Sequence, residues 1–290
     1  GQPGHPGQFA LDLDVQHIPL DQDLRTACSD ELRGLWDRVR PTGRLNGRIE
    51  IRRQGTQPVQ VAIPRFTIDS GTMQLTGFPY KLSDIRATGR YGITKAAQRR
   101  LTLNSLDARH GNTRLATRGL LEIDRRKDWM LRLESLACND LVADDDLLQA
   151  LPPRLRQTIS HLNPQRAFHV GGLIELRGAG EPGFPITAAW DLETHLPDNR
   201  LSTGVQLEDV SGRVTSRGKW YGQHAEMTGN FALNSASLWG YQFRDIKGPF
   251  HYRNQDLVIG SNQAFAPQAN NKRRLAIPLQ ERVTARAVGG

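Results

Sequence analysis

Cysteine is scarce in this sequence, and the motifs that would place a metal or a nucleophile are missing. The two cysteines, Cys28 and Cys138, occupy non-equivalent positions of an internal repeat, so we interpret them as buried thiols and favour a disulfide between them less. The eight histidines show no pair at the spacing of metal ligands. A Gly-x-Ser-x-Gly elbow is absent, and no pair of carboxylates is placed for glycoside cleavage. We therefore predict a non-enzymatic protein with no catalytic residues, no metal and no cofactor.

Long apolar runs are also lacking, which excludes a membrane-spanning helix within the sequence. No signal peptide is visible either. The chain begins at Gly1 rather than at Met, so we interpret it as a piece of a longer or processed protein, which leaves room for an upstream anchor or export signal.

Acidic residues are in the minority, since 38 Lys and Arg face 30 Asp and Glu, for a formal net charge of +8. Most arginines occur singly between apolar residues, as Arg86 and Arg90 do, and this spacing is typical of a solvated strand face. The basic cluster Lys272–Arg274 lies in a predicted tail. We therefore expect no nucleic-acid partner.

Repetition is what the sequence does have. The segment from Asp21 to Pro41 aligns without a gap with the segment from Asp144 to Pro164, about 123 residues later. Two strand-like segments, Gly47–Arg52 and Leu82–Ala87, recur as Gly172–Arg177 and Leu207–Gly212. A period this long indicates an extended, modular architecture in which each unit buries its apolar face against the next. We predict a flexible leader (1–8), a first unit (9–125), a second unit (126–262) and a basic, poorly ordered tail (263–290), the tail alternatively being the start of another unit.

Each unit is predicted to run from a strand through helices into a series of antiparallel strands, which gives a mainly β fold with helical inserts. The helices are expected over residues 21–40, 144–151 and 153–162, with Asp21 or Ser29 as a cap of the first and Asp144 as the cap of the second. For Asp144–Asp146 we favour capping over binding of a divalent cation. Strands are predicted over residues 9–15, 45–52, 59–68, 73–76, 82–91, 101–108 and 113–124, and again over 129–133, 169–177, 186–194, 205–216, 224–234, 241–252 and 256–259.

Two short motifs invite a chemical reading but favour a structural one. An apolar-x-Asp-(Ile/Val)-x-(Gly/Ala) motif occurs at Asp84, Asp209 and Asp245, where we expect the aspartate to fix a turn and the small residue to permit a bulge. Residues 178–183 spell Gly-x-Gly-x-x-Gly, but Pro182 removes an amide and a strand pattern follows where a dinucleotide site needs a helix. We therefore predict a strand-to-strand turn there.

Several phrases resemble the AsmA-like and TamB-like bacterial envelope proteins. They include the aspartate motif and the segments Leu103–Gly111 and Ala232–Gly240, while Leu24–Gly43 is similar to large AsmA-like proteins of planctomycete-type bacteria. The resemblance covers most of residues 9–260, and the helical insert in each unit departs from the plainest repeating-groove pattern. It implies a long, twisted antiparallel sheet curled into an open groove, held in the periplasm and anchored in the inner membrane through sequence outside this chain. Related proteins are implicated in phospholipid passage between membranes and are similar in outline to eukaryotic bridge-like lipid-transfer proteins.

The alternation of apolar residues supports part of this expectation, because a curled sheet would collect these side chains on its inner side. The residues predicted to line the groove are Leu101, Leu103, Leu115, Met227, Phe231 and Leu233. The helices would close it locally through Leu32, Trp36, Leu155 and Ile159.

The expected partner is a phospholipid or another acyl lipid. The same apolar faces could instead pack on the helices and on one another, and the sequence leaves both readings open. In that case the chain would be an envelope scaffold that binds protein partners. An enzyme on a β scaffold is the least favoured reading.

Overall fold

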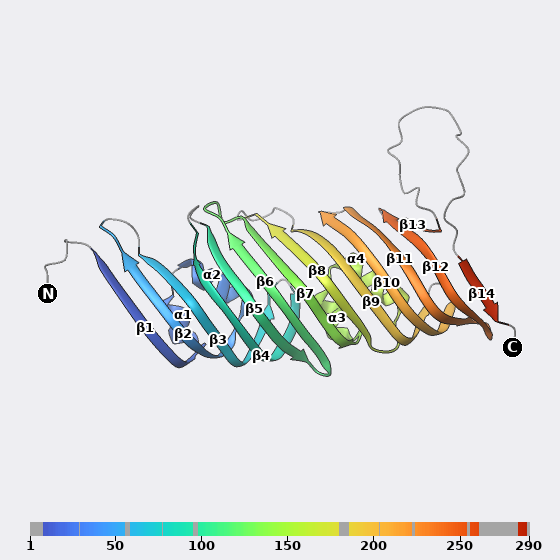
Figure 1. Ribbon diagram of the computed structural model, residues 1–290, viewed down its shortest axis with the longest axis horizontal. Helices are drawn as coiled ribbons and strands as arrows, with labels where there is room; N and C mark the ends of the chain where they lie inside the picture. Colours follow the sequence, from blue (N-terminus) through green and yellow to red (C-terminus); the bar gives the residue numbers. More distant parts are fainter. Residues whose placement is uncertain are drawn as a thin grey trace, which may run out of the picture.

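A single antiparallel sheet runs the whole length of the protein (Figure 1). The computed structural model describes residues 8–28, 30–55, 59–76, 78–94, 98–179, 186–202, 204–221, 224–253, 256–260 and 284–288. The first six strands are β1 (Phe9–Pro19), β2 (Thr42–Arg53), β3 (Gln60–Leu75), β4 (Phe78–Ile93), β5 (Arg99–His110) and β6 (Thr113–Ile123). They are followed by β7 (Trp129–Leu141), β8 (Phe168–Gly178), β9 (Thr187–Ser202), β10 (Gln206–Tyr221), β11 (His224–Leu238), β12 (Tyr241–Arg253), β13 (Asp256–Ile259) and β14 (Thr284–Val288). The predicted fold class, a mainly β protein with a curled antiparallel sheet and helical inserts, is confirmed.

The strands lie in sequence order from β1 to β13, and β14 pairs with β12. Helices α1 (Gln22–Ala27) and α2 (Asp30–Val39) connect β1 to β2, and α3 (Asp145–Ala150) and α4 (Pro153–Leu162) connect β7 to β8. The same succession of one strand, two helices and five strands therefore occurs twice. Since β6 pairs with β7 from Ile123↔Trp129 to Arg114↔Asn139, the two units share one sheet without a break.

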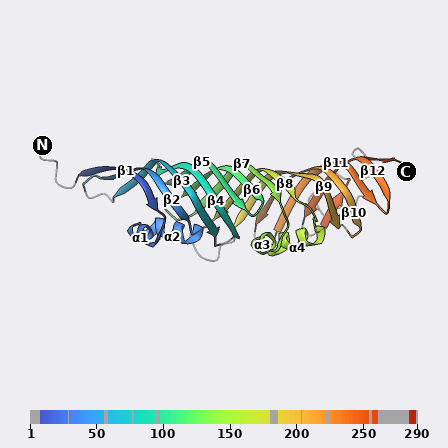
Figure 2. The same ribbon diagram turned by 90° about the horizontal axis from the view of Figure 1, so that it is seen from below.

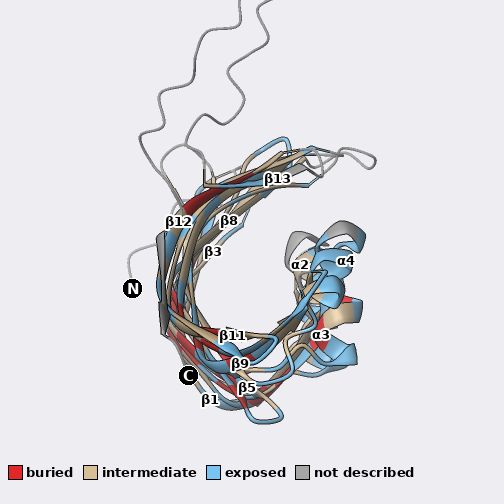
Figure 3. Ribbon diagram, turned by 90° about the vertical axis from the view of Figure 1, so that its right-hand side faces the viewer, coloured by how far each residue is buried: buried red, intermediate tan, exposed pale blue. Residues whose placement is uncertain are grey.

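The two long edges of the sheet differ. We call the edge that carries the helices, and at which β3 leads to β4, β5 to β6, β9 to β10 and β11 to β12, the helix rim, and the opposite edge the loop rim. Figure 2 shows both helix pairs on the helix rim, one near each half of the sheet. Viewed along its length, the sheet curls into a C, and the helices lie on its open side (Figure 3).

One face of the sheet is apolar and the other is charged, because successive side chains of a strand point to opposite faces. On β4 the buried residues Tyr80, Leu82 and Ile85 alternate with the exposed Lys81 and Arg86. Cross-strand ion pairs follow the charged face, including Arg48–Asp12, Arg100–Glu122 and Arg213–Glu193. Leu147 and Ala150 of α3 belong to the same buried cluster as Tyr80. Since α3 lies on the open side of the C, the apolar face is the concave one.

Bulges accompany the curl of the sheet. Ser70, Asp84, Asp209 and Asp245 all have φ between 50° and 54°, and each lies in the half of its strand nearer the helix rim. The pairing registers shift at these places, for example between Ile68 and Gly71 of β3 and between Leu207 and Val210 of β10. Bulges increase local twist and bend a strand, so a row of them bends the helix-rim side of the sheet toward the concave face.

The helices differ from the prediction in one place. The expected helix over residues 21–40 is wrong, because Cys28 is extended (φ −70°, ψ 153°) and ends α1. The predicted caps are confirmed: Asp21 accepts from the amides of Asp23 and Leu24, and Asp144 accepts from that of Leu147 at 2.9 Å. Among the described residues, no helix is long and apolar enough to cross a membrane.

The chain ends need one correction. Residues 284–288, assigned to a poorly ordered tail, form β14 and pair with β12 from Gln242↔Val288 to Lys247↔Thr284. The basic cluster Lys272–Arg274 and residues 1–7 of the predicted leader lie outside the described residues.

Candidate functional site

The six residues predicted to line a groove all lie on the concave face. Leu101 pairs with Tyr91 and Leu121, and Leu103 pairs with Gly89 and Gly119. In the second unit Met227, Phe231 and Leu233 face Tyr252, Gly248 and Ile246 of β12. Leu115 pairs with Ala108 and Cys138. All six side chains are half-buried. Leu115 and Leu233 pack against the two buried clusters of the sheet, whereas the other four belong to neither cluster.

The concave face remains partly open to solvent, above all toward the loop rim. Phe9 and Leu11 of β1 are 46% and 44% exposed, and Ile93 at the end of β4 is 43% exposed. Ile186, just before β9, and Ile259 of β13 are 43% and 57% exposed. The registers place them on the apolar face, since Leu11 pairs with Ile51 and Ile259 pairs with Phe250. These residues keep apolar surface accessible to solvent at several places along the sheet, and exposed apolar surface can serve for binding.

Large aromatic rings on this face lean over glycines of neighbouring strands. Phe66 pairs with Gly89, Trp129 with Gly178, Trp190 with Gly218 and Phe250 with Gly229. A Cβ added at any of these glycines would lie between 2.4 and 2.7 Å from an atom of its partner's ring. Each ring therefore covers its partner's position and lies along the sheet. Because it does not project across the C, the concave face is a floor and not an interdigitated core.

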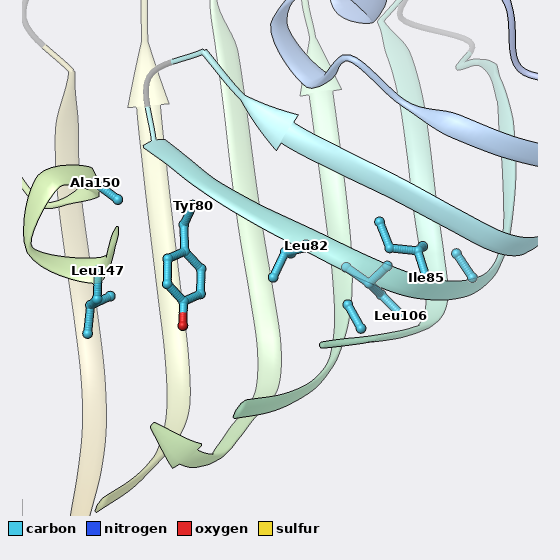
Figure 4. Packing of buried hydrophobic residues seen from close by; sticks show 8 residues of the cluster. Tyr80, Leu82, Ile85, Leu106, Leu147 and Ala150 are labelled. Carbon is cyan, nitrogen blue, oxygen red and sulfur yellow. The ribbon is translucent and has the colours of Figure 1, made fainter. Parts of the chain in front are cut away.

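Near the helix rim the floor becomes a closed core (Figure 4). Leu147 and Ala150 of α3 are 7% and 4% exposed and pack with Tyr80, Leu82 and Ile85 of β4. His110 stacks on Tyr80 with ring centroids 3.9 Å apart, and its Nε2 lies 3.3 Å from Oδ2 of Asp146 on α3. Burial raises the pKa of the Tyr80 phenol. The helix therefore covers one margin of the floor and leaves the rest uncovered.

Hydrogen bonds fix each helix pair to the helix rim. Thr76, after β3, donates its amide to Arg38 O of α2 at 2.8 Å. The corresponding link of the second unit joins Gln165 N to Arg200 O of β9 at 3.2 Å, and Asn199 Nδ2 donates to Arg166 O at 2.7 Å. Asn199 is fully buried, so its amide is a structural clamp. The helices are thus held as fixed parts of the margin.

The residues predicted to pack the helices need a correction. Leu155 of α4 is 46% exposed, because the buried apolar pair is Leu147 and Ala150 on α3. Trp36 and Ile159 are half-buried, and the side chain of Leu32 lies outside the described residues. Leu147 and Ala150 lie three residues apart after the aspartate cap, a spacing in the sequence that places both on one face of α3.

The aspartate motif takes up the bulge conformation itself. Asp84, Asp209 and Asp245 have φ values of 52°, 50° and 53°, a region that Asp and Asn tolerate better than other side chains. Asp209 also accepts a hydrogen bond from the Ser237 hydroxyl of β11 at 3.1 Å. The three aspartates of the motif therefore lie at bulges near the helix rim.

The remaining chemistry of the described residues is sparse. No group of three or more His, Cys, Asp or Glu is placed to hold a metal ion in the described parts of the chain. Cys28 and Cys138 are free and half-buried; Cys138 lies on the concave face, where burial raises the pKa of its thiol to about 11. The Gly-x-Gly-x-x-Gly segment starts at the end of β8 and leads to its antiparallel neighbour β9, with residues 180–185 outside the described ones.

Two cavities lie away from the predicted lining. One, of about 450 Å³, is lined at the helix rim by Arg109, Asn112, Arg114 and Asp140, among others. The other, of about 540 Å³, is lined by His17, Arg44 and Asp69 with three smaller residues. Both are lined in part by charged side chains and include none of the six groove residues, so the apolar floor is the stronger candidate site.

Comparison with known proteins does not identify a family for the chain. No family model, no curated protein and no solved structure matches the chain. The resemblance to AsmA-like proteins therefore stays a prediction, and we infer function from the geometry of the concave face.

Proposed function

We propose that the chain is a non-enzymatic segment of an AsmA-like envelope protein that binds or conducts phospholipid acyl chains along its concave face. The observation that carries the proposal is the open apolar floor, on which large side chains remain exposed from Phe9 to Ile259. Acyl chains would bind there through burial alone, at about 0.8 kcal/mol for each methylene removed from water. Charged headgroups would stay in solvent at the mouth of the C.

The proposal includes a location and a partner. The AsmA-like resemblance implies the periplasm, where the trough would carry lipid between the two membranes. The attachment to the inner membrane would be made by sequence outside this chain. The aromatic rings that lie over glycines support the proposal. Because they lie along the sheet, they leave space above it for an acyl chain and still present an apolar surface.

Photo-crosslinking tests the trough directly. A photoreactive residue at Phe231 or Met227, on the concave face, should recover phospholipid in cells. The matched control is Thr228, the exposed neighbour of Met227 on the charged face, where the same residue should recover none. Native mass spectrometry of the gently purified protein should show lipid adducts that disappear on delipidation.

The alternative is a structural or partner-binding scaffold of the envelope that carries no lipid. Repeated crosslinking of protein partners, with no lipid from either concave position at adequate expression, would favour the scaffold.

A further inference from the structure

The repeat allows two equivalent surfaces of the same chain to be compared. In the first unit the helix-rim end of β4 and the turn between β5 and β6 receive α3, and Tyr80 beneath it is only 6% exposed. In the second unit the equivalent position is Val205, which is 37% exposed. Ile85 and its equivalent Val210 are buried in both units, so the described residues differ at the outer end of this surface, which α3 covers in the first unit and where Val205 is exposed in the second.

The neighbouring turn makes the difference larger. The two-residue turn between β5 and β6 is Gly111-Asn112, and that between β11 and β12 is Trp239-Gly240. Trp239 and, after the turn, Tyr241 are 79% and 71% exposed. In β10 and β11, Glu208 pairs with Ser237. Three residues further in the same register, Val205 comes beside this turn. We call Val205, Trp239 and Tyr241 the apolar corner.

Neither the backbone nor packing accounts for the tryptophan. Trp239 has φ of 52°, a conformation that costs a bulky residue energy and that Asn or Gly adopts readily in such turns. Its side chain is almost wholly in solvent, so it contributes little to the fold. A strained, exposed aromatic residue of this kind points to a contact made outside the described chain.

The helix that fits such a surface is present at the other end of the molecule. Leu24 and Ala27 of α1 correspond to Leu147 and Ala150 of α3, 123 residues later, and both helices are capped by an aspartate. Yet α1 has no buried residue, and Ala27 is exposed. Figure 1 shows α1 toward the N-terminal end of the sheet and the turn between β11 and β12 toward the C-terminal end.

We propose that α1 of one copy of the chain docks on the apolar corner of a second copy, as α3 docks on Tyr80 within each copy. The contact joins two different surfaces, so it repeats head to tail and leads to chains of molecules or to a closed ring. It is independent of lipid binding, because neither surface includes the six groove residues.

Two variants block one surface each and should leave the fold intact. Ala27→Arg places a long side chain where α3 has a buried alanine, and Arg suits an exposed helix position. Trp239→Asn removes the aromatic side chain and gives the turn an Asn-Gly sequence, which should raise Tm. A purely structural role of Trp239 would not allow higher stability together with lost association. The matched control is Leu155→Arg, which removes an exposed apolar side chain of α4 that belongs to neither surface.

Sedimentation velocity of the lipid-free protein should show concentration-dependent association of the wild type and of Leu155→Arg. Ala27→Arg and Trp239→Asn should each be monomeric, with association at least about tenfold weaker. An equimolar mixture of the two variants retains one intact contact and should form a 1:1 dimer and nothing larger. A monomeric wild type at high concentration, or a mixture that stays monomeric, would overturn the proposal. Binding of a monomeric wild type to phosphatidylglycerol vesicles that is lost in Trp239→Asn would also overturn it, in favour of a membrane occupant.

Discussion

The aromatic rings that lie over glycines provide a measurable test of the floor. At Gly178 an added Cβ would lie 2.5 Å from Cε2 and Nε1 of Trp129 and 2.6 Å from its Cζ2, and these indole atoms are the three nearest neighbours it would meet. Gly178→Ala therefore has to lift the indole off the sheet. Overpacking of this kind costs about 1–3 kcal/mol, whereas the lower entropy of the unfolded chain returns about 0.4–1 kcal/mol.

The same substitution should behave differently once the ring is gone. In a Trp129→Ala background the clash is absent, so Gly178→Ala should be neutral or stabilising by about 0.4–1 kcal/mol. The double-mutant cycle, measured by urea unfolding with circular dichroism, should then give a coupling free energy of about 1–3 kcal/mol. Gly92→Ala is the control, since a Cβ there meets nothing within 4 Å. Equal effects of Gly178→Ala in both backgrounds would refute the arrangement of ring over glycine.

Three further outcomes follow from the geometry. Because the pKa of Cys138 is about 11 rather than 9.0, alkylation of its thiol at pH 8 should be about 100-fold slower in the native than in the urea-unfolded protein. With the folded pKa above the unfolded one, its contribution to stability is fully present below pH 9 and is lost as the pH rises toward 11; a flat profile of Tm over that range would count against burial. Asp144→Ala should cost about 1 kcal/mol of unfolding free energy through loss of the α3 cap, and Asp145→Ala, which removes only a charge near the helix start, should cost less. Asp84→Val should lower stability by about 1–2 kcal/mol because Val resists positive φ, while Asp84→Gly should be tolerated; equal thermal melts for both would argue against the bulge.

Local sequence patterns were sufficient for much of the fold. Alternation along β4 and β11 predicted the strands and also which side chains share a face, because the period of a strand is fixed by its backbone. The aligned aspartates at 21 and 144 predicted two caps. Alternation could not give the ends of the strands. The two strands predicted over 59–68 and 73–76 are wrong, because they form the single strand β3, and the strand predicted over 186–194 continues to Ser202 in β9.

Features that depend on partners across the sheet were not predictable in the same way. The covering of Gly178 by Trp129 requires the register of β7 and β8, which no local pattern contains. The exposure of Leu155 depends on which of two apolar helices reaches the sheet. The break at Cys28 was missed because the apolar spacing continues through it, and β14 was missed because its short segment pairs only with a distant strand.

Because both units share one sheet, the length of the protein is set by the number of units. Neighbouring strands lie about 4.8 Å apart, so six strands advance the sheet by about 29 Å measured across the strands, close to the thickness of a bilayer's hydrocarbon core. Because β6 continues into β7 without an interruption, an added unit would lengthen the molecule by one such step and leave its cross-section unchanged. Gene duplication would then alter the span of the protein in fixed increments, with no redesign of any strand already present.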